Sequence, residues 1–182
     1  EGTPHSYGNC GMHWETFNQT DGRIEFRTKI NSALDLYSNR FELSPNGEVL
    51  HKPEAGFEPI FDADLPTKDD MILGRLTAAL PRYRRHGATL DDRRQAVRDL
   101  ADVLEYLRPK MKELLTSEDE KDLFNLANSF GIRHHNDKQK TAYDTGLWLS
   151  WMFYYYLATI HVILRKVEMA AIKQDPVRPI LP

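Results

Sequence analysis

The stretch Leu147–Leu164, LWLSWMFYYYLATIHVIL, decides the fold of this sequence. It is apolar for long enough to suggest a helix that crosses a membrane. Three tyrosines, Ser150, Thr159 and His161 interrupt it, and such side chains are poor partners for lipid. A helix that is apolar around most of its circumference is also typical of the centre of a helical bundle, or of a helix that a dimer buries further. We therefore expect a core helix over residues 145–172, and no membrane partner.

Helical patterns also precede this stretch. The clearest follows Thr89, which can cap a helix that Pro109 should kink or end. Its apolar residues recur at helical spacing and form one stripe: Ala96, Val97, Leu100, Val103, Leu104 and Leu107. An earlier segment, from Asp69 to about Gly87, carries a similar stripe, and Ser117 with Glu120 predicts a capping box for a later helix.

The N-terminal half adds one extended element. Two short apolar runs flank Pro45-Asn46-Gly47, and an Asn-Gly pair supplies the positive φ that a tight hairpin turn needs. The sequence therefore predicts a mainly α fold, a helical bundle with one small β-hairpin. We expect a loose leader at 1–21 and a single helical domain at 22–174. Within that domain the hairpin lies near 40–52 and the core bundle at 69–173, and an extended tail follows at 175–182.

Composition limits the cellular setting. The 182 residues suit one domain, and the net charge of -3 argues against a surface coated for nucleic acid, although a local basic groove remains compatible with it. Cys10 is the single cysteine, so no internal disulfide can form and a reducing cytoplasm is expected. The chain begins at Glu1 with no apolar leader, and we interpret it as a piece of a longer protein with other domains.

The densest polar cluster lies just before the long apolar helix, in IRHHND at residues 132–137. Two adjacent imidazoles, His134 and His135, can supply one neutral base and one cationic acid near neutral pH. Arg133 suits a phosphate, Asn136 can donate to a developing phosphorane, and Tyr143 is an accessory donor or stacking ring. Together these groups can cleave RNA without a metal or another cofactor. The alternative interpretation is a solvated connection between two helices.

A second basic group gives a weaker indication of phosphate binding. RYRRHG places Arg82, Arg84 and Arg85 together, which predicts either a surface that follows a polyanion's phosphates or a solvated turn that nearby aspartates neutralise.

A metal site is not expected, because the sequence has no pair of ligands at metal-binding spacing. His161 is interpreted as a hydrogen-bonded core histidine.

The segment DLFNLANSFGIRHHNDKQK, followed by a long aromatic-rich helix, resembles the HEPN superfamily, and in particular HEPN-like domains of bacterial abortive-infection and phage-defence proteins. The resemblance covers roughly residues 89–166. It implies an α-helical homodimer with a metal-independent endoribonuclease site at the dimer interface, in which Arg133 is the motif arginine and His134 the adjacent polar residue. The family's histidine farther along is absent, since Lys138, Gln139 and Lys140 occupy that part of the motif. His135 would then serve in a shortened motif, or the domain would bind RNA without cleaving it.

Two functions therefore remain open, beside a third in which a ligand-sensing domain binds a small molecule such as a nucleotide in an aromatic-lined pocket. One is a cytoplasmic RNA-cleaving or RNA-binding domain in a bacterial antiviral defence or toxin system, dimeric through the helix at 145–172. The other is a non-catalytic dimerisation or sensor module that regulates a missing effector domain. In that case the partner surface would be the aromatic face of Trp148, Trp151, Tyr154 and Tyr155.

Overall fold

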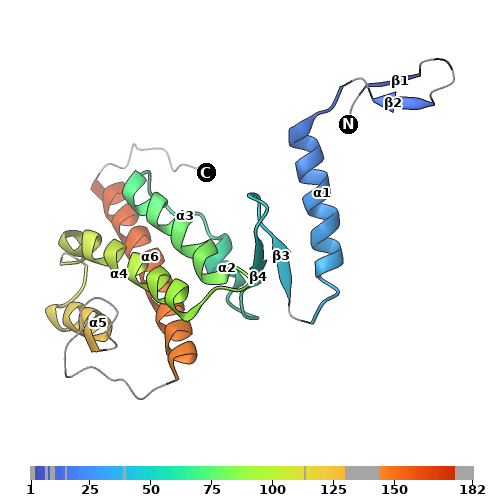
Figure 1. Ribbon diagram of the computed structural model, residues 1–182. Helices are drawn as coiled ribbons and strands as arrows, with labels where there is room; N and C mark the ends of the chain where they lie inside the picture. Colours follow the sequence, from blue (N-terminus) through green and yellow to red (C-terminus); the bar gives the residue numbers. More distant parts are fainter. Residues whose placement is uncertain are drawn as a thin grey trace. The chain divides into compact units, whose positions relative to one another are not determined.

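The computed structural model describes residues 3–6, 8, 11–14, 16–38, 40–112, 114–129 and 144–174. Within these ranges the chain is mainly helical, with two small antiparallel sheets of two strands each (Figure 1). This confirms the predicted mainly α fold with a hairpin in the N-terminal half. Contacts divide the chain into two units, Glu1–Lys52 and Pro53–Pro182. The single helical domain at 22–174 remains a prediction.

The first unit contains a short sheet, a helix and a hairpin. Strands β1 (Pro4–Ser6) and β2 (Met12–Trp14) pair with Pro4 opposite Trp14, inside the stretch expected to be a loose leader. Helix α1 (Gln19–Leu34) begins after Asn18, whose side chain accepts hydrogen bonds from the backbone N–H groups of Thr20 and Asp21. This cap satisfies two donors of the first turn and fixes the start of the helix.

The hairpin of this unit is formed by β3 (Phe41–Leu43) and β4 (Val49–His51), with Phe41 opposite His51. Its turn is closed by the N–H of Gly47, which donates to the carbonyl of Ser44 at 3.0 Å. Gly47 has a φ of 84°, a conformation that costs glycine little and other residues more. The predicted Asn-Gly turn is confirmed.

The second unit is a helical bundle. Its helices are α2 (Glu58–Asp62), α3 (Asp70–Arg84), α4 (Leu90–Met111), α5 (Ser117–Ser129) and α6 (Thr145–Gln174). Helices α3, α4 and α6 lie side by side, with α5 at the edge of the group (Figure 1). Every residue of the stripe predicted in α4, from Ala96 to Leu107, is buried in the shared core. The apolar spacing of that one helix therefore identified the centre of the bundle.

Side-chain hydrogen bonds cap the starts of both α4 and α5. Thr89 and Asp92 form a capping box at the start of α4, as expected. Pro109 lies inside the last turn of α4, which continues to Met111. The box at the start of α5 is formed by Thr116 and Asp119, with Thr116 Oγ1 accepting from the Asp119 N–H at 3.2 Å. The predicted pair of Ser117 and Glu120 was therefore wrong by one residue, because two overlapping Ser/Thr-x-x-Asp/Glu patterns occur there.

Helix α6 is the only described helix that is long and apolar enough, by length and composition, to cross a membrane. One of its faces is nevertheless packed into the bundle against α4. Eight residues on that face are at most 3% exposed: Leu149, Met152, Phe153, Tyr156, Leu157, Ile160, Ile163 and Leu164. This burial is that of a core helix, in agreement with the sequence interpretation.

Candidate functional site

The predicted catalytic group, Arg133, His134, His135 and Asn136, lies outside the described residues, as does Tyr143. The structure defines only the elements that border it. Helix α5 ends at Ser129 and α6 begins at Thr145, so the group belongs to the connection between these two helices. The first turn of α6 is capped by Asp144, whose Oδ1 accepts from the N–H of Leu147 at 3.0 Å. The chemical roles of the four residues stay predictions.

The second predicted group, Arg82, Arg84 and Arg85, is described, and each guanidinium has a contact within the bundle. Arg82 Nη1 bonds the carboxylate of Asp99, and Arg84 lies over the Phe61 ring at 4.8 Å. The Nη2 atom of Arg85 is 3.7 Å from a carboxylate oxygen of Asp92. These contacts favour the interpretation as a neutralised turn, because a phosphate would have to compete with them.

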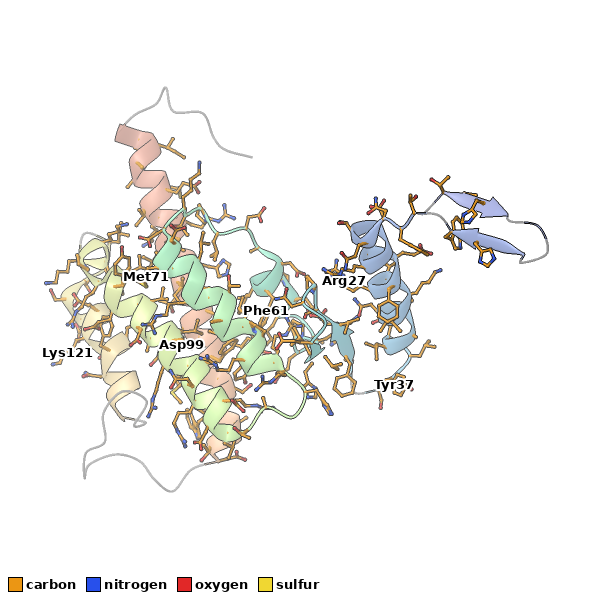
Figure 2. All side chains as sticks on the ribbon, turned by 45° about the horizontal axis from the view of Figure 1, so that its top comes forward. Arg27, Tyr37, Phe61, Met71, Asp99 and Lys121 are labelled. Carbon is orange, nitrogen blue, oxygen red and sulfur yellow. The ribbon has the colours of Figure 1, made fainter. Side chains whose placement is uncertain are left out.

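Asp99 on α4 is the centre of a charged cluster that the sequence analysis did not single out. Its side chain is 8% exposed and lies where α4 runs beside α3 (Figure 2). Besides Arg82, its carboxylate accepts from Arg75 Nη1 at 3.3 Å and from Gln95 Nε2 at 3.1 Å. Arg75 also bonds Asp102 at 2.9 Å. A buried carboxylate needs such partners, and here the arrangement ties α3 to α4.

The signal for this cluster was present in the sequence. Asp99 follows Ala96 by three residues and precedes Val103 by four, so helical periodicity places it on the buried stripe. An acid at such a position requires a basic partner on the facing helix, and Arg75 and Arg82 are those partners. The cluster is structural, since these bonds join side chains of α3 to side chains of α4.

A ladder of aromatic rings joins α2, α3 and α6. Tyr83 stacks on Phe153 with ring centroids 3.8 Å apart, and Phe61 stacks on Phe153 at 6.2 Å. Burial raises the pKa of Tyr83, although its hydrogen bond with Ser150 acts in the opposite direction. The hydroxyl therefore stays protonated at neutral pH, which suits a packing role rather than proton transfer.

Tyr154 belongs to this ladder and not to an exposed aromatic face. Its ring lies 4.5 Å from that of Phe57, and its hydroxyl accepts from the N–H of Glu54 at 3.4 Å. The side chain of Tyr154 leaves α6 toward the segment that contains α2, and its inclusion in the partner surface stays a prediction. Neighbouring Tyr155 points elsewhere, since successive residues on a helix are separated by about 100°.

The remaining aromatic residues of α6 form an exposed patch. Trp151 is 43% exposed and Tyr155 40%, and their rings stack at 5.6 Å. Trp148 meets Trp151 edge to face at 5.3 Å and is partly buried against the core. Farther along the helix, Val162 and Met169 are 54% and 58% exposed. We call Trp148, Trp151, Tyr155, Val162 and Met169 the α6 face.

The α5 helix borders the α6 face with negative charge. Partial burial raises the pKa of Tyr155, and the carboxylates of Asp122 and Asp119 raise it further. Helix α5 is held to α4 by Arg108, whose Nε bonds Glu120 at 2.6 Å and whose guanidinium lies over the Phe124 ring at 4.6 Å. The α6 face therefore has an apolar, aromatic centre and an acidic rim near its N-terminal half.

His161 lies between the core and the α2 segment. It is half-buried, and it hydrogen-bonds the backbone of Ile60. Burial lowers its pKa from the usual 6.5, the bond to Ile60 opposes this, and Arg165 lowers it further. These contacts agree with the interpretation of a hydrogen-bonded histidine that packs α6 against α2.

The part of the chain that the structure describes brings no three His, Cys, Asp or Glu side chains into a group that could hold a metal ion.

No family model, no curated protein and no solved structure matches this chain. The resemblance to the HEPN superfamily therefore remains an expectation carried by the sequence pattern alone.

Proposed function

We propose that this chain is a helical association module that pairs with a second copy of itself through the α6 face. The supporting observation is the exposed, stacked pair of Trp151 and Tyr155 on a helix whose opposite face is fully buried. Exposed tryptophan and tyrosine supply large apolar area at little entropic cost and are enriched at the centres of interfaces. Exposed apolar side chains in continuous series are uncommon on monomers.

The spacing of the α6 face supports another helix as its partner. Positions 148, 151, 155, 158, 162, 165 and 169 follow alternating steps of three and four residues. This is the a/d repeat that holds one helix against another along a continuous seam. Six of the seven are apolar or aromatic, with Ala158 at the middle, and the exception is Arg165. A small residue at the centre lets two backbones approach closely.

The position of Arg165 favours a second copy in antiparallel orientation. Trp151 and Arg165 lie seven positions on either side of Ala158 (158 − 151 = 7 and 165 − 158 = 7). Arg165 Nη2 donates to the carbonyl of Asp64 at 3.3 Å. In an antiparallel pair centred on Ala158, each Arg165 would exchange this bond for Trp151 of the other copy, a cation–π contact of about 0.5–2 kcal/mol. A parallel pair would instead place two Arg165 side chains together. The symmetric arrangement makes the same surface complementary to itself.

Sedimentation velocity over a range of protein concentrations tests this proposal. The wild-type chain is expected to sediment as a reversible dimer, and Trp151→Glu combined with Val162→Glu is expected to sediment as a monomer. Each substitution introduces a charge into the apolar seam, so the dissociation constant should rise by at least about 30-fold, the effect of one hot-spot residue.

Leu90→Glu is the matched control for these variants. Leu90 is 50% exposed and lies at the start of α4, where a carboxylate is favourable to the helix dipole. This variant should remain dimeric. A wild-type chain that is monomeric at all concentrations, or glutamate variants that dimerise like the wild type, would exclude the proposal.

A second candidate function is metal-independent RNA cleavage by Arg133, His134, His135 and Asn136, in a cytoplasmic defence or toxin system. It is supported by the order of the sequence, in which this group precedes α6, the helix that carries Trp148 and Trp151. The family resemblance implies a composite site at a dimer interface, so an α6 pair would serve both functions.

In that mechanism, a neutral His135 removes the proton from a ribose 2′-hydroxyl, which attacks the adjacent phosphorus. Arg133 and Asn136 stabilise the added negative charge, and the cationic His134 protonates the leaving 5′-oxygen. The products are a 2′,3′-cyclic phosphate and a 5′-hydroxyl. Atoms and protons balance without a metal.

Digestion of single-stranded RNA by the pure protein in EDTA tests this candidate. Arg133→Ala with His135→Ala should abolish cleavage and leave the helical circular dichroism spectrum unchanged. Lys138→Ala, a neighbouring cation without an assigned role, should cleave like the wild type. Dimerisation without cleavage in the wild type would leave the association module as the function.

A further inference from the structure

The first unit contains an open groove between α1 and the β3–β4 hairpin. Its volume is about 580 Å³, within the range of sites for small molecules or a few nucleotides. One wall is α1, which contributes Arg23, Phe26 and Arg27, and the other is the turn Ser44–Gly47 after Leu43. Arg27 extends from α1 and is labelled in Figure 2.

Asn31 holds the two walls together. Its Oδ1 accepts from the N–H of Leu43 at 2.6 Å, and its Nδ2 donates to the Leu43 carbonyl at 3.3 Å. The amide side chain thus pairs with the outer edge of β3 as a neighbouring strand would. Ser44 is 8% exposed, and its Oγ accepts from the Glu48 N–H at 3.0 Å, which fixes the turn. Both walls are therefore positioned by hydrogen bonds within this unit.

The groove carries an uncompensated positive charge. Arg23 and Arg27 are four residues apart on α1, so their Cβ atoms are roughly 5–6 Å apart on one side of the helix. Among the described residues, no carboxylate lines the groove and neither guanidinium has an acidic partner. By contrast, Lys29 on the same helix is paired with Glu25 at 2.6 Å. Two unpaired guanidiniums favour an anionic ligand with two charges at similar spacing.

Apolar surface lies beside these charges. Phe26 is 60% exposed and Ile24 54%, and both line the groove. Helix α1 has no buried residue. An exposed phenylalanine next to two arginines offers a ring face on which a base can stack while the phosphates lie against the guanidiniums, the usual combination at single-stranded nucleic-acid sites.

We propose that this groove binds the backbone of a single-stranded nucleic acid, with Arg23 and Arg27 on successive phosphates and Phe26 under a base. An acidic peptide is the competing ligand of the same charge. Peptides that bind beside a strand do so by pairing with its free edge, and the Leu43 edge of β3 is already occupied by Asn31. The site uses residues of the first unit and does not depend on the α6 face or on residues 133–136.

Fluorescence anisotropy of the full chain with a labelled oligodeoxythymidylate of about 10 nucleotides tests the proposal. This probe has no 2′-hydroxyl, so the proposed RNA cleavage cannot act on it and failure of that function leaves the measurement unchanged. Arg23→Gln with Arg27→Gln should weaken binding by at least about tenfold at low salt. It should also reduce the slope of log affinity against log salt by about 1.4, or 0.7 for each lost phosphate contact.

Two further variants keep the result interpretable. Lys29→Gln removes a cation from the same helix outside the groove and should bind like the wild type. Phe26→Leu keeps an apolar side chain and removes the ring, and should weaken binding by about tenfold with an unchanged salt slope. Absence of binding by the wild type, or an unaltered salt slope in the double variant, overturns the proposal. Displacement of the probe by oligoglutamate of equal charge assigns the groove to acidic peptides instead.

Discussion

Replacement of Asp99 by alanine measures how strongly the charged cluster ties α3 to α4. The carboxylate is 8% exposed and has three donors, from Arg75, Arg82 and Gln95. Breaking a fully buried ion pair costs about 3–5 kcal/mol, because the remaining charge is left in a dry environment. Here the side chains of Arg75 and Arg82 are 44% and 36% exposed, so water can reach both guanidiniums after the substitution. The cost should therefore lie below that range.

The individual contacts of Asp99 give the size of the expected loss in the free energy of unfolding. The bond to Arg82 is charge-assisted and contributes about 1.5–3 kcal/mol. After the substitution Arg75 still bonds Asp102 at 2.9 Å, so the loss of its contact with Asp99 costs little. Gln95 is exposed and can bond water instead. Asp99→Ala should lower the free energy of unfolding by about 2–3 kcal/mol at neutral pH. Asp102→Ala, which removes a 39% exposed partner of the same arginine, should cost less than about 1 kcal/mol.

Urea unfolding followed by far-ultraviolet circular dichroism provides the assay. The midpoint should fall for Asp99→Ala with an unchanged slope, since the surface exposed on unfolding is the same. A double-mutant cycle with Arg82→Ala should give a coupling energy above about 1 kcal/mol. The reasoning is refuted if Asp99→Ala and Asp102→Ala cost the same, because the burial of Asp99 would then have no energetic consequence.

Four further predictions concern the rest of the fold. Thr116→Ala should cost about 1 kcal/mol in urea unfolding and Ser117→Ala much less, and equal costs would contradict the observed cap. Phe153→Ala should cost about 3–5 kcal/mol because it empties a fully buried site in the aromatic ladder, and a loss below 1 kcal/mol would contradict that packing. Asn31→Ala should release the Leu43 edge of β3 and increase hydrogen exchange of its backbone amide. Unchanged exchange would mean that the Asn31 side chain does not stabilise this edge. The pKa of His161 is lowered in the folded chain, so stability should fall as pH decreases through 6.5 toward the folded value, and His161→Gln should lose less stability over that interval.

The parts of the fold that the sequence predicted depend on local patterns. The stripe from Ala96 to Leu107 predicted α4 and the core, because one-face burial follows directly from helical periodicity. The Asn46-Gly47 turn followed from backbone conformation. The cap of α5 was misplaced by one residue, since Thr116 and Ser117 both fit the local pattern and only the observed hydrogen bonds distinguish them.

The parts that sequence reasoning missed depend on contacts between distant segments. Tyr154 looks equivalent to Tyr155 in the sequence, and only packing against Phe57 separates the partly buried ring from the exposed one. The groove beside Arg27 forms because Asn31 pairs with Leu43, and no local sequence pattern indicates that pairing. The roles assigned to Arg133 and its neighbours remain predictions, because those residues lie outside the described part of the chain.

Oxidative cross-linking at position 158 tests the central claim, that two copies pair through α6, most directly. In a symmetric pair centred on Ala158, this residue lies next to its own counterpart, and a cysteine there can form a disulfide when the Cβ atoms are about 3.5–4.5 Å apart. In a Cys10→Ser background, Ala158→Cys should give a covalent dimer on a non-reducing gel, while Asp91→Cys, on a 90% exposed side chain of α4, should stay monomeric. A monomeric Ala158→Cys chain, or equal cross-linking at both positions, contradicts the pairing.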